Sequence, residues 1–469
     1  MDSNSKQIAK LKRRYSKWPP NRSLLTNPSS ILNYLPVTVA IWILKYSIKS
    51  EYTLKRESIK FFALSNRAYG ARNLRKCDRL LRIATELLGS NFPKSYESLL
   101  RNAIVSTFKN PENRRAISIT VFDSTTQVES SFFDATGWYQ LSRGLFSLGY
   151  FRAAWVAREN SLRLSMLEAT LKDQSATGLI RGLQAYLEKR NLLQIRELLL
   201  LNKHKLSTKS LANIESTLTL IEKKIWPLFS DSGSKHESSR EVLRSLVSKK
   251  TVAIVGPGVP HGNYGNEIDA FDTVIRMKFI GEKMLDDRNF HGSRTDISYI
   301  GAIDALKLQE FELRNDLKNL KLLLSHPTAI NVIGSVPVYG FEDDDVIYRT
   351  PTTSGIRTLK EVIKMEPSNL KIFGFDFYST LMPYSKQMTG FYESSSWRFE
   401  HPNDFVINGV YLKFYRSRDF SVHDPVSNFC FAQNLYKAGL FDIEPYGKSI
   451  LELTPYQYVE RLEEMLGDW

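Results

Sequence analysis

A glycine-rich stretch after an apolar segment is the first feature of this 469-residue sequence that could do chemistry. Thr251–Val255 is apolar and β-branched, and Gly256, Gly258, Gly262 and Gly265 follow it. A strand that leads into such a loop lets backbone N–H groups approach a nucleotide phosphate or ribose, because glycine has no Cβ. The spacing is neither G-x-G-x-x-G nor that of a P-loop. The loop therefore predicts a nucleotide site without identifying the nucleotide.

A second cluster, Thr352-Thr-Ser-Gly355, lies at the start of a predicted helix that runs to about Met365. Thr and Ser favour N-cap positions, and the free N–H groups of a first helical turn attract anions. We expect a phosphate or a sugar carboxylate there, with Gly355 opening space for it. The alternative is an ordinary helix cap, which these four residues would also make.

The two clusters belong to a longer pattern that resembles the sialyltransferases of glycosyltransferase family 29. The family's large motif is an apolar strand and V-G, a glycine-rich loop, then E-I-D, D, V-I-R-M and G-S-R-T. This sequence has, in the same order, Val255-Gly256, Glu267–Asp269, Asp272, Val274–Met277 and Gly292–Thr295. The small motif is similar to Pro351–Gly355 with the strand at Lys371–Asp376. The resemblance covers about residues 250–440 and not the N-terminal half.

The resemblance also supplies candidate catalytic residues. His423-Asp-Pro-Val-Ser-Asn428 is similar to the very small motif, with Asn428 where the family has glutamate. It implies that His423 is the base in a single, inverting displacement. The third motif is altered, because Gly390 stands where its histidine is expected, and His401 is the candidate replacement.

What the resemblance implies is transfer of a sialic-acid-type sugar from a CMP-activated donor to a glycan or glycolipid. Loss of CMP needs a base for the acceptor hydroxyl and donors that hold the departing charge, and a histidine titrates in the right range. The residues expected around the donor are Gly256, Pro257, Gly258, Asn266, Arg276, Lys278, Ser293, Arg294, Thr295, Thr353, Ser354, Gly355, Phe375, Asp376 and Tyr392.

Departures from the family pattern keep alternatives open. Pro257 and Lys278 stand where family members commonly carry asparagine, so a CMP-Kdo-dependent transferase of capsule or lipopolysaccharide is the nearest alternative. A helical-repeat adaptor with a degenerate transferase domain is the alternative from another class. Asp343–Asp345 offers oxygen ligands for Mg²⁺ or Mn²⁺. An acidic surface turn is the favoured interpretation, and neither a metal nor another cofactor is expected.

The elements that must position these residues differ in their sequence pattern between the two halves of the chain. Residues 50–228 have helical spacing and predict an all-α domain, and a Ser-rich linker is expected at 229–248. Residues 249–469 alternate short apolar runs with helices, which predicts an α/β, Rossmann-like domain; the resemblance implies a GT-A-variant sialyltransferase fold. The helical domain looks TPR-like, because one helical hairpin pattern is matched by Trp138, Leu141, Leu145, Gly149, Tyr150 and Ala154.

Positive charge is concentrated at the N-terminus. The chain has 64 Lys+Arg against 50 Asp+Glu, and the first 80 residues alone hold 17 basic and 4 acidic side chains. Residues 1–49 therefore form a basic segment suited to anionic lipid or an acidic glycan. Nucleic acid is the least expected partner, since the region lacks interleaved aromatic platforms.

Cysteine content and hydropathy bear on location. Cys77 and Cys430 are far apart with no C-x-x-C pair, which favours a reducing compartment. The apolar run Val37–Leu44 is much shorter than the ~20 residues of a membrane span. We expect a cytoplasmic, bacterial enzyme of surface-polysaccharide synthesis, associated peripherally with the inner membrane.

Overall fold

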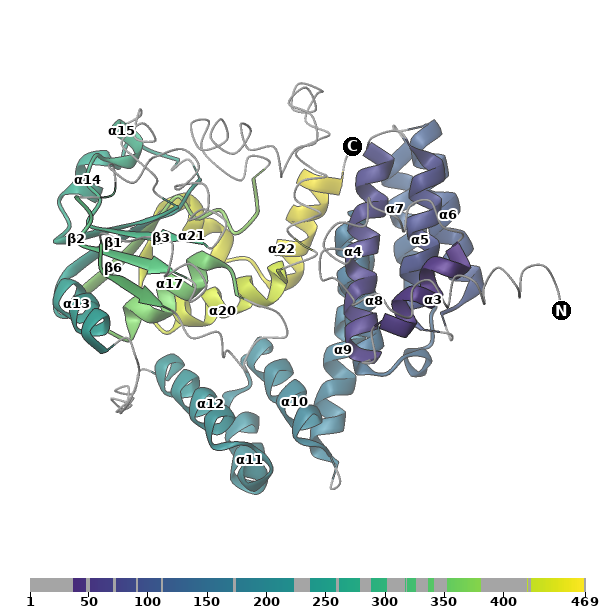
Figure 1. The fold of residues 1–469 in the computed structure, drawn as a ribbon, viewed down its shortest axis with the longest axis horizontal. Coiled ribbons are helices and arrows are strands. Elements are labelled where there is room, and N and C mark those ends of the chain that lie inside the picture. Colours follow the sequence, from purple (N-terminus) through teal and green to yellow (C-terminus); the bar gives the residue numbers. More distant parts are fainter. Residues whose placement is uncertain are drawn as a thin grey trace. The chain divides into compact units, whose positions relative to one another are not determined.

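The protein is represented by a computed structural model, and Figure 1 shows its fold. The described residues are 37–47, 51–70, 73–89, 92–110, 113–171, 174–222, 237–258, 261–278, 288–301, 317, 319–325, 336–340, 352–380, 420 and 423–467. The chain divides into two compact units. Unit 1 combines Met1–Ser161 with Lys413–Ser421 and Gly467–Trp469, and unit 2 combines Leu162–Leu412 with Val422–Leu466.

Unit 1 is helical throughout its described part, as the sequence predicts. Its helices cover successive stretches of the N-terminal third and are coloured purple to blue in Figure 1. They are α3 (Val37–Ser47), α4 (Glu51–Gly70), α5 (Leu74–Leu88), α6 (Lys94–Lys109), α7 (Arg114–Thr126), α8 (Ala135–Leu148) and the first half of α9 (Phe151–Thr170).

The predicted helical hairpin is formed by α8 and α9. Gly149 ends α8 in the left-handed region, with φ of 82°, which glycine adopts without strain. The Ser142 hydroxyl donates to the Ala154 carbonyl at 2.8 Å, and the Ser161 hydroxyl donates to the Ala135 carbonyl at 2.6 Å. These crossed pairings make the two helices antiparallel. Trp138 and Tyr150 of the motif are fully buried.

Unit 2 contains a parallel sheet of seven strands within the described residues. The order across the sheet is β5-β4-β3-β2-β1-β6-β7, and every neighbouring pair is parallel. Most strands are buried runs of Val, Ile and Leu, as expected where helices cover both faces. The strands are β1 (Thr251–Val255), β2 (Thr273–Met277), β3 (Ile297–Ile300), β4 (Leu322–Ser325), β5 (Val338–Gly340), β6 (Asn369–Phe373) and β7 (Asp442–Ile443).

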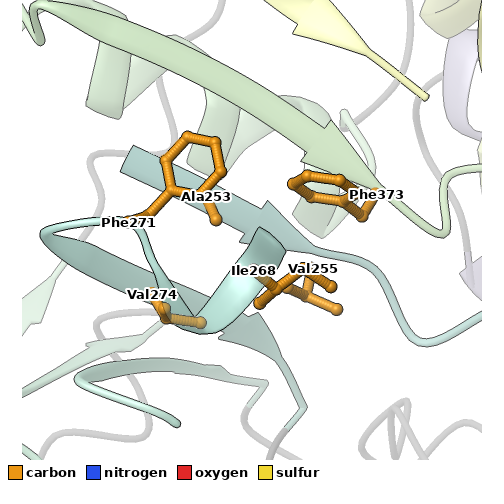
Figure 2. Packing of buried hydrophobic residues seen from close by; sticks show 6 residues of the cluster. All are labelled: Ala253, Val255, Ile268, Phe271, Val274 and Phe373. Atoms are coloured by element: carbon orange, nitrogen blue, oxygen red, sulfur yellow. The ribbon is translucent and has the colours of Figure 1, made fainter. Parts of the chain in front are cut away.

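The core beside β1 is built from the first strand–helix–strand unit. Figure 2 shows Ile268 of the short helix α14 (Gly265–Asp269) packed with Val255, Val274 and Phe373 from three neighbouring strands. Gly265 permits this close packing, because a Cβ there would lie 1.9 Å from the Arg288 carbonyl oxygen. This strand–helix–strand segment therefore fixes where the loop after β1 leaves the sheet.

The expected linker at 229–248 is corrected in its second half. Residues 237–247 form helix α13 (Glu237–Val247), whose Leu243 and Val247 are fully buried. The helix is amphipathic and packs against β4 and β5, and the Thr273 hydroxyl donates to its Leu246 carbonyl. The serines between the apolar positions of α13 made residues 229–248 resemble a linker. Residues 223–236 lie outside the described part.

The compact units also divide the helices differently from the expected 50–228 domain. α10 (Ala176–Glu188), α11 (Leu192–Asn202) and α12 (Thr208–Ile221) belong to unit 2, with the boundary inside α9. The reason is contact with α20 (Pro425–Lys437): α10 and α12 pack on it, and the Asn434 side-chain amide donates to the Leu187 carbonyl at 3.1 Å. Unit 2 also contains the helices α15 (Arg288–His291), α17 (Ser354–Ile363), α21 (Pro445–Leu451) and α22 (Pro455–Leu462).

Both cysteines are buried and form no disulfide bond, and one lies in each unit. Cys77 on α5 is 1% exposed and Cys430 on α20 is 3% exposed. Burial raises the pKa of the Cys77 thiol to about 11, against the opposing hydrogen bond with Ser65. Among the described helices, none has both the length and the apolar character needed to cross a membrane.

Candidate functional site

The strand order reverses direction at β1, and this defines the candidate site. β2 to β5 lie on one side of β1, and β6 and β7 lie on the other. In open parallel sheets, ligands bind beyond the carboxyl ends of the strands at such a switch point. We use the name switch-point site for the four segments that meet there: Gly256–Gly258, Gly374–Thr380, Thr352–Gly355 and His423–Asn428.

The loops after β1 and β6 pack directly on each other. The Gly256 amide donates to the Phe373 carbonyl at 2.7 Å, and a Cβ on Gly256 would lie 2.3 Å from the Gly374 carbonyl oxygen. A Cβ on Gly258 would lie 2.9 Å from the same oxygen. Gly374 itself has φ of 65°. These glycines are therefore required for the close approach of two backbones, in addition to any approach of a ligand.

Phe375 occupies the space that Gly355 was expected to open. A Cβ on Gly355 would lie 2.5 Å from Phe375 Cε1, and a Cβ on Gly256 would lie 2.9 Å from Phe375 Cδ2. The ring thus lies between the first loop and the start of α17, and its side chain is only half-buried. The expectation of open space is corrected: a nucleotide entering here would meet an aromatic face.

Asp376 shapes its own loop. Its Oδ1 accepts the Tyr378 amide at 3.0 Å, and its Oδ2 accepts the Thr380 hydroxyl. Phe377 and Tyr378 have positive φ values of 48° and 65°, which are unusual for side chains of this size. Both carboxylate oxygens therefore help hold a strained turn at the carboxyl end of β6.

The start of α17 is joined to the start of α20 by one hydrogen bond. Thr353 is the N-cap of α17 without a side-chain cap bond, and its amide donates to Asn428 Oδ1 at 2.9 Å. The Asn428 side-chain amide in turn donates to the Asp424 carbonyl at 2.7 Å. Thr352 is 4% exposed, and its hydroxyl has no hydrogen-bond partner among the described residues. Ser354 and Gly355 are half-buried.

His423 lies immediately before this junction. Asp424 is the fully buried N-cap of α20, and its Oδ1 accepts the Ser427 amide at 3.0 Å. The half-buried His423 therefore precedes the turn whose Asn428 contacts Thr353. The segments predicted as small and very small motifs, 75 residues apart at this contact, meet in unit 2.

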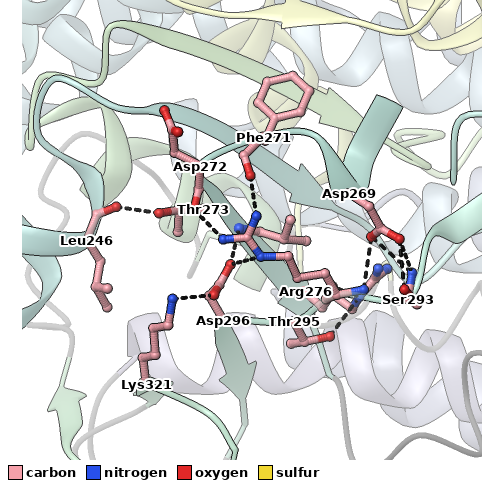
Figure 3. Close-up of polar contacts among 12 residues, drawn as sticks. Leu246, Asp269, Phe271, Asp272, Thr273, Arg276, Ser293, Thr295, Asp296 and Lys321 are labelled. Carbon is pink, nitrogen blue, oxygen red and sulfur yellow. Dashed lines mark hydrogen bonds and ion pairs between the residues drawn. The ribbon is translucent and has the colours of Figure 1, made fainter. Parts of the chain in front are cut away.

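Another part of the predicted large motif forms a polar network that joins α14, β2 and the segment before β3. Asp269, at the end of α14, accepts the amides of Ser293 at 2.8 Å and Arg294 at 2.9 Å (Figure 3). The Ser293 hydroxyl donates to the same carboxylate at 2.8 Å. Burial raises the pKa of Asp269, but these hydrogen bonds and the charge of Arg276 outweigh burial and leave that pKa below its usual value.

Two arginines complete the network. Arg276, 4% exposed, donates from Nε to the Arg294 carbonyl at 2.9 Å and the Thr295 hydroxyl at 2.8 Å, and from Nη2 to the His291 carbonyl at 2.7 Å. Burial lowers its pKa to about 10, and Asp269 opposes that change. Arg294 donates to the carbonyls of Phe271 and Asp272, the residues that lead into β2.

Four of the donor-binding candidates belong to this network. Ser293, Arg294 and Thr295 precede β3. Asp269 accepts the amides of Ser293 and Arg294, and Arg276 near the carboxyl end of β2 donates to the Arg294 carbonyl and the Thr295 hydroxyl. Their polar groups hold the segment that enters β3.

The remaining candidate site residues either lie elsewhere in unit 2 or fall outside the described part of the chain. Pro257 is half-buried in the first loop, Asn266 is exposed on α14, and Lys278 ends β2 with φ of 61°. Tyr392, His401 and Asp343–Asp345 lie outside the described residues. Within the described ranges, no group of three or more His, Cys, Asp or Glu side chains is placed to hold a metal ion.

Two residues at the carboxyl edge were not predicted. His261 follows the first loop and is exposed, and Glu444 follows β7 and is 1% exposed. The His-Gly pair inside the glycine-rich stretch was an available signal for His261. Nothing near Glu444 in the sequence indicates chemistry, because only the pairing of β7 with β6 brings it to this edge.

Comparison with known proteins adds no family assignment. No protein-family model matches the chain, and no curated protein matches it. The likeness to family 29 therefore remains a prediction from the sequence motifs.

Proposed function

We propose that the chain is a CMP-sugar-dependent glycosyltransferase, similar to family 29, that transfers a sialic-acid-type sugar to a glycan or glycolipid with inversion. The observation that carries the proposal is the contact between the Thr353 amide and Asn428 Oδ1 beside the loops after β1 and β6. It joins two motif segments at the edge where open α/β sheets bind nucleotides. A Rossmann-like glycosyltransferase fold is part of this proposal.

The donor would use groups that the helix start leaves available. The cap residue Thr353 makes no side-chain bond to the first amides of α17, and the Thr352 hydroxyl has no partner among the described residues. Amides of a first helical turn stabilise a phosphate or carboxylate. The half-exposed Phe375 ring offers a stacking surface for the cytosine base.

His423 would be the base for the acceptor hydroxyl. It lies just before the buried cap Asp424, whose carboxylate holds the first turn of α20 through Ser427. A base at this position would take the acceptor proton as the bond to the anomeric carbon forms. CMP leaves with the electron pair of the broken bond. Neither step requires a metal. The basic residues 1–49 would bind an anionic membrane surface on which a glycolipid acceptor lies.

A second candidate is the adaptor whose transferase-like domain binds without turnover. Phe375 between Gly256 and Gly355 favours it, because the ring takes space where a donor would lie. Three exposed leucines on α11 also favour it: Leu193, Leu200 and Leu201 are 70–75% exposed. Apolar side chains grouped in this way are typical of protein-binding surfaces.

The test is CMP release from CMP-N-acetylneuraminic acid and CMP-Kdo with a glycolipid acceptor panel. We expect turnover with one donor and a loss of about 10²–10⁴-fold in kcat for His423→Ala. His204→Ala is the matched control, because His204 is exposed on the turn after α11. CMP binding without release from either donor would support the adaptor. An unchanged rate in His423→Ala would assign the base elsewhere.

A further inference from the structure

Helix α11 carries apolar side chains on two opposite faces, and its inner face is packed. Ile195, Leu198 and Leu199 are at most 5% exposed, and the helix packs on α10. The ion pair between Arg196 and Glu222, at 2.6 Å, joins α11 to the end of α12. Because these contacts lie within unit 2, they fix which face of α11 points away from its neighbours.

The outer face of α11 consists of Leu193, Glu197, Leu200 and Leu201. The three leucines are 70–75% exposed, and Glu197 among them is exposed as well. Spacings of three, four, seven and eight residues place these four side chains on one side of a helix. A helix with apolar side chains all round is normally buried, so a binding partner that covers the outer face is expected.

A second pair of exposed leucines lies near the end of α11. Leu167 and Leu171, at the end of α9 and directly after it, are 56% and 55% exposed. Gln174 joins this segment to the end of α11, because its side-chain amide donates to Asn202 Oδ1 at 3.0 Å and its Oε1 accepts Lys205 Nζ at 2.9 Å. Exposed leucines from two segments of unit 2 therefore lie near the same end of α11.

The residues that flank α11 are basic. Residues 189–209 run from the turn before α11 to the start of α12 and hold six Lys or Arg against one acidic residue, Glu197. Arg190 before the helix and Lys203 after it are both exposed. Beyond residue 80 the whole chain holds 47 Lys and Arg, these six included, against 46 Asp and Glu. The positive charge around α11 is therefore a local excess and not a property of the whole region.

The charge around the exposed leucines favours a lipid surface over a protein partner. Leucines with basic residues beside them can enter the boundary between headgroups and acyl chains, while the basic side chains attract anionic headgroups. Protein interfaces are depleted in lysine and depend on aromatic or arginine anchors, and none of the four outer-face residues is of either kind. An anionic bilayer complements both the apolar character and the charge of this surface.

We propose that the outer face of α11 is a membrane-docking surface, on which an anionic phospholipid bilayer covers the leucines and Arg190 and Lys203 contact the headgroups. The proposal goes beyond the proposed reaction and does not require turnover. It adds an apolar contact in unit 2 to the charge-based binding proposed for residues 1–49. Burial of apolar area and attraction between charges both strengthen the binding of a peripheral protein to a membrane.

The first test is hydrogen exchange on the wild-type, full-length chain. Vesicles of equal parts phosphatidylglycerol and phosphatidylethanolamine should slow amide exchange over residues 192–206, and vesicles of phosphatidylcholine alone should not. Peptides from the mostly buried α20 are the control and should be unchanged. If the anionic vesicles bind the chain without slowing exchange over residues 192–206, or do not bind it, the proposal is wrong. Either result leaves the proposed transferase reaction unaffected, because CMP release is measured without vesicles.

The second test is cosedimentation of full-length variants with the same anionic vesicles. The triple variant Leu193→Gln, Leu200→Gln and Leu201→Gln should bind about ten-fold or more weakly. Its thermal unfolding should match wild type, since the three side chains are exposed. Glu197→Gln should bind several-fold more tightly, because it removes a negative charge that faces anionic lipid. Ile119→Gln on α7 is the matched control, because Ile119 is an exposed apolar residue of unit 1.

Two outcomes of the second test would overturn the proposal. Equal vesicle binding by the wild-type chain and the triple variant would show that the leucines do not enter the bilayer. A wild-type dimer that the triple variant converts to a monomer, with no vesicle binding by either, would assign the outer face to a second copy of this chain.

Discussion

Two regions of unit 2 differ in how fully their polar groups are hydrogen-bonded. Around the segment that enters β3, Asp269 and Arg276 are bound to backbone amides and carbonyls by several hydrogen bonds each. At the carboxyl edge, the Thr352 hydroxyl is buried without a hydrogen-bond partner among the described residues. A satisfied network stabilises a fold, whereas buried unpaired groups suggest a ligand. The predicted large-motif residues Asp269 and Arg276 therefore stabilise the fold, whereas Thr352 of the predicted small motif carries the hydroxyl that a ligand would satisfy.

The largest effect should come from the network. Arg276→Met leaves three acceptors, one of them in a fully buried hydrogen bond, and the Asp269 carboxylate without their cation, so we expect a loss of about 3 kcal/mol in the free energy of unfolding. Urea denaturation measures it, with Arg163→Met on the exposed face of α9 as the control. If Arg276→Met keeps wild-type stability but loses CMP binding, Arg276 contacts the ligand, and its assignment to a structural network is wrong.

Gly256→Ala should affect both stability and ligand binding. The new Cβ would lie 2.3 Å from the Gly374 carbonyl oxygen, and neither backbone can move without shifting its strand. We expect about 2 kcal/mol of destabilisation and weaker CMP binding. Gly178→Ala on α10 is the control, because its nearest neighbour would be 3.5 Å away. If Gly256→Ala folds with wild-type stability, the two loops do not pack as described.

Asn428→Ala tests the link between α17 and α20. It removes the acceptor for the Thr353 amide and the donor to the Asp424 carbonyl, which should cost about 1 kcal/mol and weaken CMP binding several-fold. Thermal unfolding and calorimetry measure the two effects, and Asn289→Ala at an exposed position is the control. A loss of stability with unchanged CMP affinity would make the contact purely structural.

The smallest effect concerns acid stability. The pKa of Asp269 is below its usual value in the folded chain, so its contribution is complete above the pKa of an unfolded aspartate and is lost as pH falls through the folded value. Asp269→Asn should therefore be less stable than wild type at neutral pH and should show a weaker decline in stability below pH of about 4. Parallel declines in urea titrations of the two proteins would argue against the hydrogen bonds drawn in Figure 3.

Local patterns in the sequence predicted much of the architecture. The α8–α9 hairpin follows from the small and aromatic residues between Trp138 and Ala154, and β1, β2 and β6 follow from their apolar runs. The glycine-rich stretch predicted a loop directly after β1, and Gly256–Gly258 form one. These features depend on periodicity and on glycine geometry over short distances, which a sequence displays directly.

Features that depend on long-range packing were not predictable. The apolar stripe of α13 was hidden in Ser-rich composition, and the place of α10–α12 in unit 2 depends on α20, more than 200 residues later. Phe375 was expected to contact a donor, but its position between Gly256 and Gly355 follows from the approach of two loops. Glu444 reaches the site only through the pairing of β7 with β6. Contacts of this kind leave no local pattern.

The two buried thiols give this protein a built-in reporter of partial unfolding. Cys77 lies in unit 1 and Cys430 in unit 2, and each is at most 3% exposed. A thiol-specific alkylating reagent can modify either one only after the surrounding helices open, and the raised pKa of Cys77 slows its reaction further. Mass spectrometry of the two cysteine-containing peptides across a denaturant series would record the opening of each unit separately, without any introduced label.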